Sequence, residues 1–416
     1  MSTTVRRMQD LTVEDHVIEV PLVWDDPRDI RTISVHAAVV SRDGGESLPY
    51  LLFLQGGPGN EAPTPFHSPV APSWLDDALE HYRVVMLDQR GTGQSTPVGD
   101  GMLAEHSAAE MAEYLTHLRA DSIVRDAEAM RQHLGVETWS VLGQSFGGFT
   151  TLAYLSVAPE SLHRVYFTGG LSAVGLDPVH VYATCYDKMR EASQRYYRRF
   201  PTHRDRMRRL ADRAAAGGIV LPDGEVVSVS RLRSLGMLLG GDHGWQQLWQ
   251  LLEHDPETNA FRYDLATALP FGGRNPMYYV LHESSYADGF VTDWAAERAE
   301  PDDFKDDVTL LTGEHVRRDW ARTVPWMQPW AEVVDLLAAH PWGRLYDADR
   351  IRAADPTGAA AVYATDVYVP MEYSLETAAL MPGVRTWVTS EHEHSGLRTG
   401  SVLPRLFDLA ADRRVR

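Results

Sequence analysis

Residues 141–149, VLGQSFGGF, place an uncharged serine in a glycine-lined corner. Within them, GQSFG matches the pattern G-x-S-x-G, and it stands between a strand-forming run and a helix-forming run. In that context the pattern is typical of a nucleophile elbow, in which the serine Oγ projects above the carboxyl edge of a sheet. We therefore expect Ser145 to be a nucleophile. The backbone N–H of Phe146, at the helix start, would face a developing oxyanion.

A serine nucleophile needs a base and an acid that orients the base, and after such an elbow they follow in the order Asp or Glu, then His. Asp366 stands in YATDVYV, just past an apolar run, and His394 stands in SEHEHSG, just past the last one. Their separation of 28 positions leaves room for one helix and one strand between them. We expect His394 to take the Ser145 proton and return it to the leaving amine, while Asp366 fixes the imidazole tautomer.

Other residues near these positions could fill the same roles. His392 is two residues from His394 and could be the base, and Asp347 or Asp349 could be the acid. We favour Asp366 and His394 because both follow apolar, strand-like runs.

An oxyanion hole also needs a second N–H, and a glycine-rich stretch could supply it. Residues 56–59, GGPG, follow the apolar run YLLFLQ, and the Gly57 amide is the expected donor. Residues 88–95, DQRGTGQS, end the next apolar run and are interpreted as a structural turn near the site. They lack the lysine-and-hydroxyl ending of a phosphate-binding loop.

These corners must be held by regular elements, and the sequence alternates between strand and helix patterns. HVIEVPLVW and TISVHAAVVS indicate paired antiparallel strands, whereas YLLFLQ and YRVVMLDQ suit buried parallel strands. Residues 107–135 have helical spacing and end at Gly135, a plausible C-cap. The alternation predicts an α/β fold with a mostly parallel, doubly wound sheet.

The alternation stops in the middle of the chain, where successive helical runs are broken by Gly and Pro. We therefore predict a first core part at residues 1–177, an inserted helical cap at 178–343, and a second core part at 344–416.

Composition excludes several classes of protein. A net charge of −19 disfavours nucleic acid and anionic membrane surfaces. The single cysteine, Cys185, excludes an intrachain disulfide framework, and no apolar run has the length of a signal peptide or a membrane span. Glu391–His394, EHEH, lacks helical metal-ligand spacing. We expect a cytoplasmic protein without metal or cofactor; nothing indicates an oligomeric state.

Together, GGPG, DQRGTGQS and GQSFGGF, with the later acid and histidine, resemble the proline iminopeptidase family of α/β-hydrolases. The resemblance spans the beginning, middle and end of the core. It implies a serine aminopeptidase that removes an N-terminal residue, preferentially proline, from small peptides under a helical cap. The chain departs from many relatives at Gln55, where they have histidine.

An aminopeptidase must recognise a free, charged α-amine, and buried carboxylates would serve because an ammonium group taken out of water needs a partner charge. In the family, two cap glutamates do this. The resemblance implies Glu253, in WQQLWQLLEHD, and Glu283, in an E-x-x-Y segment with Tyr286. An esterase or amide hydrolase of the same fold would lack this carboxylate pair, and a non-catalytic ligand-binding protein of this fold would show no turnover.

Overall fold

The computed structural model describes residues 2–8, 10–66, 73–241 and 243–412. Its centre is a nine-stranded sheet in the order β1-β2-β3-β5-β4-β6-β7-β8-β9. The strands are β1 (Ser2–Met8), β2 (Leu11–Pro21), β3 (Thr32–Arg42), β4 (Tyr50–Leu54), β5 (Arg83–Leu87), β6 (Trp139–Gln144), β7 (Leu162–Thr168), β8 (Gly358–Tyr363) and β9 (Val384–Thr389).

The first three strands are antiparallel, and β4 to β9 are parallel. The predicted α/β class and mostly parallel sheet are therefore confirmed. β1 was not predicted, because its sequence, STTVRRM, is short and polar.

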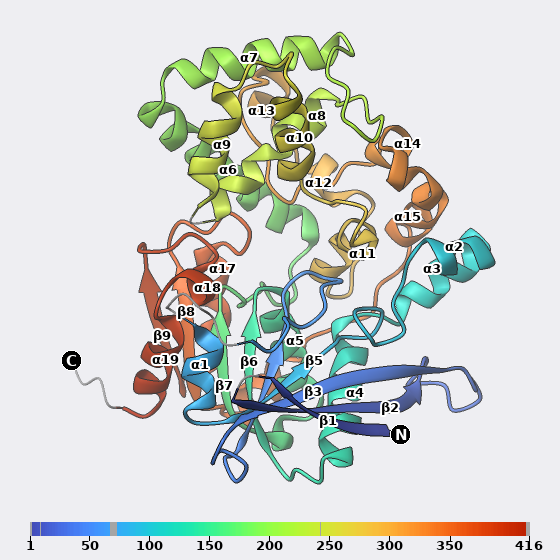
Figure 1. Cartoon of the computed structure of the whole chain (residues 1–416), viewed down its shortest axis with the longest axis vertical. Helices are drawn as coiled ribbons and strands as arrows, with labels where there is room; N and C mark the ends of the chain where they lie inside the picture. Colours follow the sequence, from blue (N-terminus) through green and yellow to red (C-terminus); the bar gives the residue numbers. More distant parts are fainter. Residues whose placement is uncertain (1, 9, 67–72, 242, 413–416) are drawn as a thin grey trace.

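Helices cover both faces of the sheet (Figure 1). The helices of the core are α1 (Trp74–Leu79), α2 (Asp100–Glu105), α3 (Ala108–Thr116), α4 (Ala120–His133), α5 (Phe146–Val157), η1 (Pro159–Ser161), α16 (Ala348–Ala354), α17 (Met371–Ala378), α18 (Gly396–Thr399) and α19 (Val402–Ala410). α4, α5 and α16 pack together on one face, and α1 and α19 lie on the other.

The period of two along β4 explains why both faces need a cover. Leu52 and Leu54 belong to the hydrophobic cluster that includes α5, whereas Leu51 and Phe53 belong to the cluster that includes α1 and α19. All four side chains are buried, as expected for a parallel strand with helices on both sides.

The helical stretch predicted at residues 107–135 is two helices. Ser107 and Glu110 form a capping box that starts α3, and the chain breaks at His117–Arg119 before α4. Gly135, with φ of 68°, ends α4 as predicted. Residues 401–414, SVLPRLFDLAADRR, also have a helical pattern in the sequence, and α19 forms there from Val402 to Ala410; residues 413 and 414 lie outside the described residues.

A second group of helices lies between β7 and β8, above the carboxyl edge of the sheet (Figure 1). They are α6 (Pro178–Arg199), α7 (Thr202–Ala215), α8 (Val229–Arg233), η2 (Ser234–Gly240), α9 (Gly244–Glu253), α10 (Asn259–Ala268), α11 (Pro276–Val280), η3 (Glu283–Tyr286), α12 (Ala295–Arg298), α13 (Asp302–Asp306), α14 (Trp320–Thr323), η4 (Pro325–Trp330) and α15 (Ala331–Ala338).

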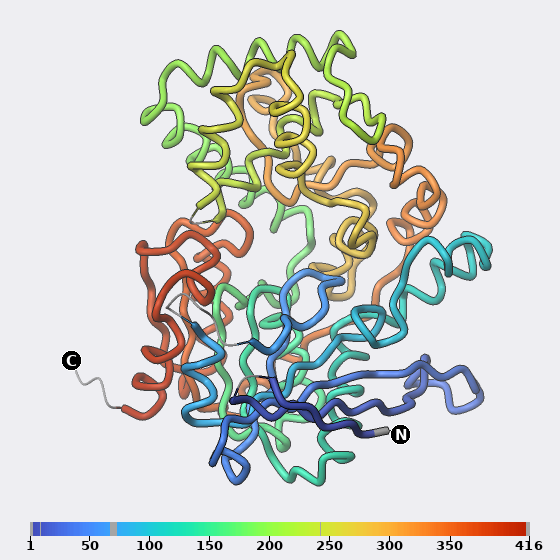
Figure 2. Tube along the Cα trace, in the orientation of Figure 1, coloured from blue at the N-terminus to red at the C-terminus, as the bar shows by residue number. Residues whose placement is uncertain are grey.

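We call residues 178–343 the cap segment, with the boundaries predicted from the sequence. Figure 2 shows the chain leaving the core in green and returning in orange. By Ala348, where α16 begins, the chain again packs on α5. In the described residues no helix is long and apolar enough to cross a membrane.

Candidate active site

Ser145 occupies a sharp corner between β6 and α5. Its φ of 53° and ψ of −124° lie in a region that L-residues rarely adopt. The corner closes because the glycines on either side allow close approach. A Cβ on Gly143 would lie 2.5 Å from the Gly147 carbonyl oxygen, and one on Gly147 would lie 1.9 Å from the Leu54 carbonyl oxygen. The G-x-S-x-G pattern is therefore a steric requirement of this corner.

Asp366 and His394 meet at the carboxyl ends of β8 and β9. His394 Nδ1 lies 2.7 Å from Asp366 Oδ2, and the other carboxylate oxygen accepts the backbone N–H groups of Tyr368 and Val369 at 2.9 and 3.0 Å. The acid is therefore fixed by the backbone. With Nδ1–H directed at Asp366, a neutral His394 ring carries its acceptor at Nε2.

Burial lowers the pKa of His394. The charge and hydrogen bond of Asp366, together with the charge of Glu314, raise this pKa by more than burial lowers it, so the pKa lies above its ordinary value. This pKa favours proton acceptance by the imidazole.

Ser145 and His394 both lie against the chain that follows β7. The Ser145 N–H donates to the Thr168 carbonyl at 3.0 Å, and His394 Nδ1 is 3.0 Å from the position that a Cβ on Gly169 would take. Among the described residues, Ser145 Oγ has no hydrogen-bond partner, which leaves the hydroxyl available.

The loop after β4 lies directly over the elbow. A Cβ on Gly56 would be 2.9 Å from Ser145 Cβ, so Gly57 is next to the serine. The loop is held from the cap segment, because Asn275 Nδ2 donates to Asn60 Oδ1 at 2.9 Å. As the first residue of α5, Phe146 has an N–H without an intrahelical acceptor.

The alternative acids lie elsewhere. Asp347 accepts the backbone N–H groups of Asp349 and Arg350 at the start of α16, and Asp349 pairs with Arg352. Both carboxylates are therefore occupied at the start of α16. His392 lies beside Tyr363, with ring centroids 6.1 Å apart.

Glu253 lies at the end of α9 and faces α7. Its carboxylate oxygens are 2.8 Å from His203 Nε2 and 3.0 Å from Arg206 Nη1, and 36% of its side chain is exposed. The contact with His203, followed by the charge of Arg206, lowers its pKa. None of these contacts brings Glu253 to Ser145 or His394. The expectation that it reaches the substrate amine has no support in this arrangement.

Glu283 is buried at the start of η3, and its two carboxylate oxygens accept the N–H groups of Ala295 and Ala296 at 3.1 and 2.9 Å. It thus caps α12. Burial raises its pKa to about 7. It lines a cavity of about 20 Å³ with Thr292 and Trp294, large enough for about one water molecule.

A third carboxylate, Glu314, was not predicted from the sequence. The Tyr278 hydroxyl donates to its Oε1, and His282 Nε2 lies 3.8 Å from its Oε2. Burial raises the pKa of Glu314 to about 7, although Tyr278 and the charge of His394 lower it. Glu314 and His394 therefore interact electrostatically. Glu314 follows a glycine in an irregular stretch, TGEHVRR, where no periodicity could have revealed it.

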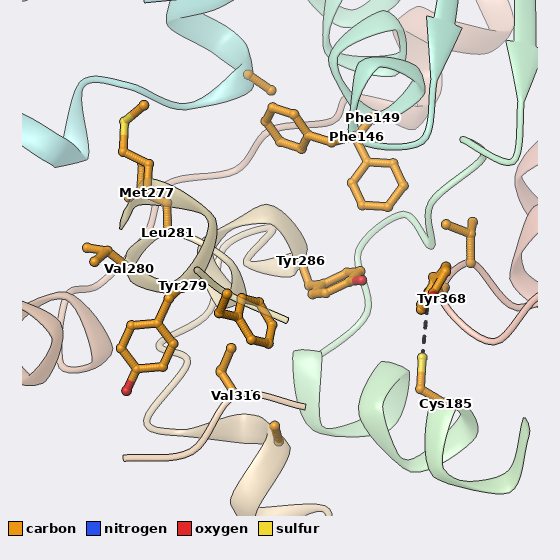
Figure 3. Close-up of a cluster of buried hydrophobic side chains, with 14 of the residues drawn as sticks. Phe146, Phe149, Cys185, Met277, Tyr279, Val280, Leu281, Tyr286, Val316 and Tyr368 are labelled. Atoms are coloured by element: carbon orange, nitrogen blue, oxygen red, sulfur yellow. Dashed lines mark hydrogen bonds between the residues drawn. The ribbon is translucent and has the colours of Figure 1, made fainter. Parts of the chain in front are cut away.

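Aromatic rings line the space between the elbow and the cap segment. Tyr286 of η3 points toward Phe149 of α5, with ring centroids 5.7 Å apart (Figure 3). Tyr368 lies edge-on to His394 at 4.9 Å, and Tyr182 contacts Tyr286 at 5.5 Å. These rings give the site an apolar wall suited to a small apolar group.

A family model of the alpha/beta hydrolase fold matches residues 49–214. A proline iminopeptidase of Aeromonas sobria is 38% identical over 426 residues, covering 96% of each chain. Another from Aspergillus aculeatus is 30% identical over 422 residues, covering 95% of this chain and 93% of that protein. A solved proline iminopeptidase from Mycobacterium smegmatis covers 99% of this chain and 97% of its own, at 13% identity and a TM-score of 0.41.

Proposed function

Because the chain belongs to the proline iminopeptidase family of α/β-hydrolases, we propose that it removes N-terminal proline from short peptides through an acyl-enzyme on Ser145. The observation that carries the proposal is the full-length likeness to two proline iminopeptidases. The 2.7 Å contact between His394 and Asp366 beside the serine elbow supports it.

In the proposed reaction, His394 Nε2 takes the Ser145 proton as Oγ attacks the prolyl carbonyl carbon. The N–H groups of Gly57 and Phe146 stabilise the resulting oxyanion. Collapse of this intermediate breaks the peptide bond, and His394 gives its proton to the leaving amine. Water then attacks the acyl-enzyme by the same route and releases proline.

We assign the free α-amine of the substrate to Glu314. An ammonium group needs a partner charge when it leaves water, and Glu314 is a buried carboxylate that interacts with His394. Its Oε1 is oriented by Tyr278, and the pKa of the neighbouring His282 is lowered by burial to about 3, so that His282 is neutral and does not compete for the carboxylate. Glu283 and Glu253 already bind α12 and α7 groups.

A prolyl anilide with a free amine tests the proposal directly. We expect turnover by the purified chain, and loss of about 10⁴-fold or more in kcat for Ser145→Ala. N-acetylation of the anilide should lower kcat/KM strongly, because it removes the charge that Glu314 binds.

Equal rates on free and acetylated anilides would contradict amine recognition, and activity of Ser145→Ala would contradict the mechanism. Neutral acyl esters cleaved faster than the free anilide would indicate an esterase. A cytoplasmic location stays a prediction from the sequence.

A further inference from the structure

A cationic side chain of the core, Arg398, contacts the residue that precedes Ser145. Arg398 is in α18, the short helix that begins two residues after His394. Its Nη2 donates to Gln55 Oε1 at 3.2 Å and lies 3.5 Å from Gln144 Oε1. Gln144 directly precedes Ser145, and Gln55 directly precedes the loop that carries Gly57.

Arg398 also lines an open cavity of about 360 Å³. Phe53, Phe66 and Trp74 contribute aromatic walls, and the Trp74 ring stacks on Phe53 with centroids 4.3 Å apart. The cavity therefore combines one guanidinium group with apolar surface, and it lies between α18, α1 and the loop after β4.

Among the residues that the structure describes, Arg398 contacts two amide oxygens through its side chain and pairs with no carboxylate. Arg233 and Arg317 of the cap segment differ, because both pair with Glu300. A guanidinium group binds a carboxylate through a pair of parallel hydrogen bonds, and Arg398 retains donors for that purpose.

The distance to Ser145 limits what an anionic ligand could be. A Cβ on Gly56 would lie 2.6 Å from Gln144 Oε1 and 2.9 Å from Ser145 Cβ. With the 3.5 Å contact of Arg398, these distances place Arg398 Nη2 within about 9 Å of Ser145 Cβ. One extended residue spans about 3.5 Å, so this separation matches one or two residues beyond the cleaved bond.

We propose that Arg398 binds the C-terminal carboxylate of the peptide released by the reaction, so that the preferred substrates are dipeptides and tripeptides with a free carboxyl end. The aromatic walls of the cavity would hold an apolar side chain of the released residue. This inference rests on the proposed function, because it assigns the leaving side of the same reaction.

A purely structural role for Arg398 makes a different prediction. If the guanidinium group only holds Gln55 and Gln144 in place, its removal disturbs the oxyanion loop and lowers turnover of every substrate alike. If it binds a carboxylate, its removal lowers turnover only of substrates that carry one. The ratio between two substrates separates the roles.

The experiment measures kcat/KM for prolyl-phenylalanine, for its C-terminal amide and for a prolyl anilide. For the unchanged chain we expect the free acid to exceed the amide by about 10- to 100-fold, the range for hydrogen bonds to a charged group. In Arg398→Gln this acid-to-amide ratio should fall to about 1, whereas Arg398→Lys should keep part of it. Arg385→Gln, at an exposed arginine of β9 that pairs with Asp412, is the matched control and should keep the full ratio.

Three outcomes overturn the inference. The first is an acid-to-amide ratio near 1 in the unchanged chain. The second is an equal loss of kcat/KM on all three substrates in both Arg398→Gln and Arg398→Lys. Circular dichroism checks that the Arg398→Lys variant is folded. The third is the absence of cleavage of any of the three substrates, which overturns the proposed function and this inference with it. Cleavage of the anilide with a ratio near 1 overturns the inference alone.

Discussion

The charges of Glu314 and His394 influence each other in the candidate active site. His394 is held by Asp366, and Glu314 is held by Tyr278 on α11. The two groups come from the core and from the cap segment, and each alters the pKa of the other. A bound substrate ammonium group would supply a counter-charge to the buried Glu314 carboxylate.

Glu314→Gln tests this assignment. The variant keeps the shape and an oxygen for Tyr278 but has no charge, so we expect KM for a free prolyl anilide to rise about 10- to 100-fold. Glu253→Gln is the matched comparison, since Glu253 is one of the two candidates, with Glu283, that the family resemblance implied. A rise of KM in Glu253→Gln and not in Glu314→Gln would reverse the assignment.

The pKa of about 7 for Glu314 predicts a pH dependence. Burial has raised this pKa, so the carboxyl group is neutral below about pH 7 and loses affinity for the ammonium group as the pH falls. KM should therefore rise below pH 7 in the unchanged chain. In Glu314→Gln, KM should no longer rise below pH 7. The kcat of this variant should still fall at low pH, because His394 becomes protonated. An unchanged KM profile in the variant would contradict the assignment.

Among the elements, β4 and α5 interlock behind the nucleophile. Gly147 of α5 approaches the last residue of β4 so closely that the Leu54 carbonyl oxygen occupies the space of a side chain. This contact fixes the start of α5 against the sheet, and with it the Phe146 N–H and the position of Ser145. The predicted elbow thus depends on two elements that are distant in the sequence.

Gly147→Ala should push the start of α5 away from the end of β4. Its Cβ would lie 1.9 Å from a backbone oxygen, which has no freedom to rotate away, so we expect a loss of about 3 kcal/mol in the free energy of unfolding together with a large loss of kcat. Urea unfolding monitored by fluorescence measures the first quantity.

Gly101→Ala in α2 is the control, because no atom lies within 4 Å of its added Cβ. It should change stability by at most about 1 kcal/mol, in the stabilising direction. Equal effects of the two variants would show that the close approach at Gly147 is not the cause.

At the scale of the whole molecule, the cap segment contacts the core at the loops that carry the proposed catalytic groups. The His394 N–H donates to the Gly240 carbonyl at 2.9 Å, and the Tyr368 hydroxyl donates to the Met237 carbonyl, so η2 holds the base loop and the acid loop. On the other side, Asn275 holds the oxyanion loop. The cap segment therefore does more than cover the site.

Arg119 joins the two parts away from these loops. It is buried at the start of α4, donates to the carbonyls of Ala287 and Gly343, and lies over the Trp342 ring. Arg119→Met should lower the free energy of unfolding by about 2 kcal/mol through the lost charged hydrogen bonds.

Arg125→Met is the matched control for this prediction, because Arg125 is on the same helix and forms an exposed pair with Asp25. An exposed pair contributes at most about 1 kcal/mol. Thermal unfolding of the two variants should therefore differ, and an equal change would contradict the proposed link between the core and the cap segment.

Local sequence patterns were enough to predict the fold class and the family of this protein. Strand periodicity predicted the mostly parallel sheet, and the motifs at residues 56–59, 88–95 and 143–149 indicated the family that the full-length relatives confirm. These motifs can be recognised in the sequence because a tight corner brings backbone segments so close together that only a few residue types, glycine above all, fit there.

Only the tertiary structure distinguishes the three buried or half-buried carboxylates by their contacts. Glu253, Glu283 and Glu314 are each plausible as isolated residues, yet they contact α7, α12 and Tyr278 respectively. The same holds for Arg398, because its position beside the serine elbow is defined by Gln55 and Gln144, which lie 343 and 254 positions away in the sequence. A charge acts over a few ångströms in space, and irregular cap loops place their side chains by packing that leaves no period in the sequence.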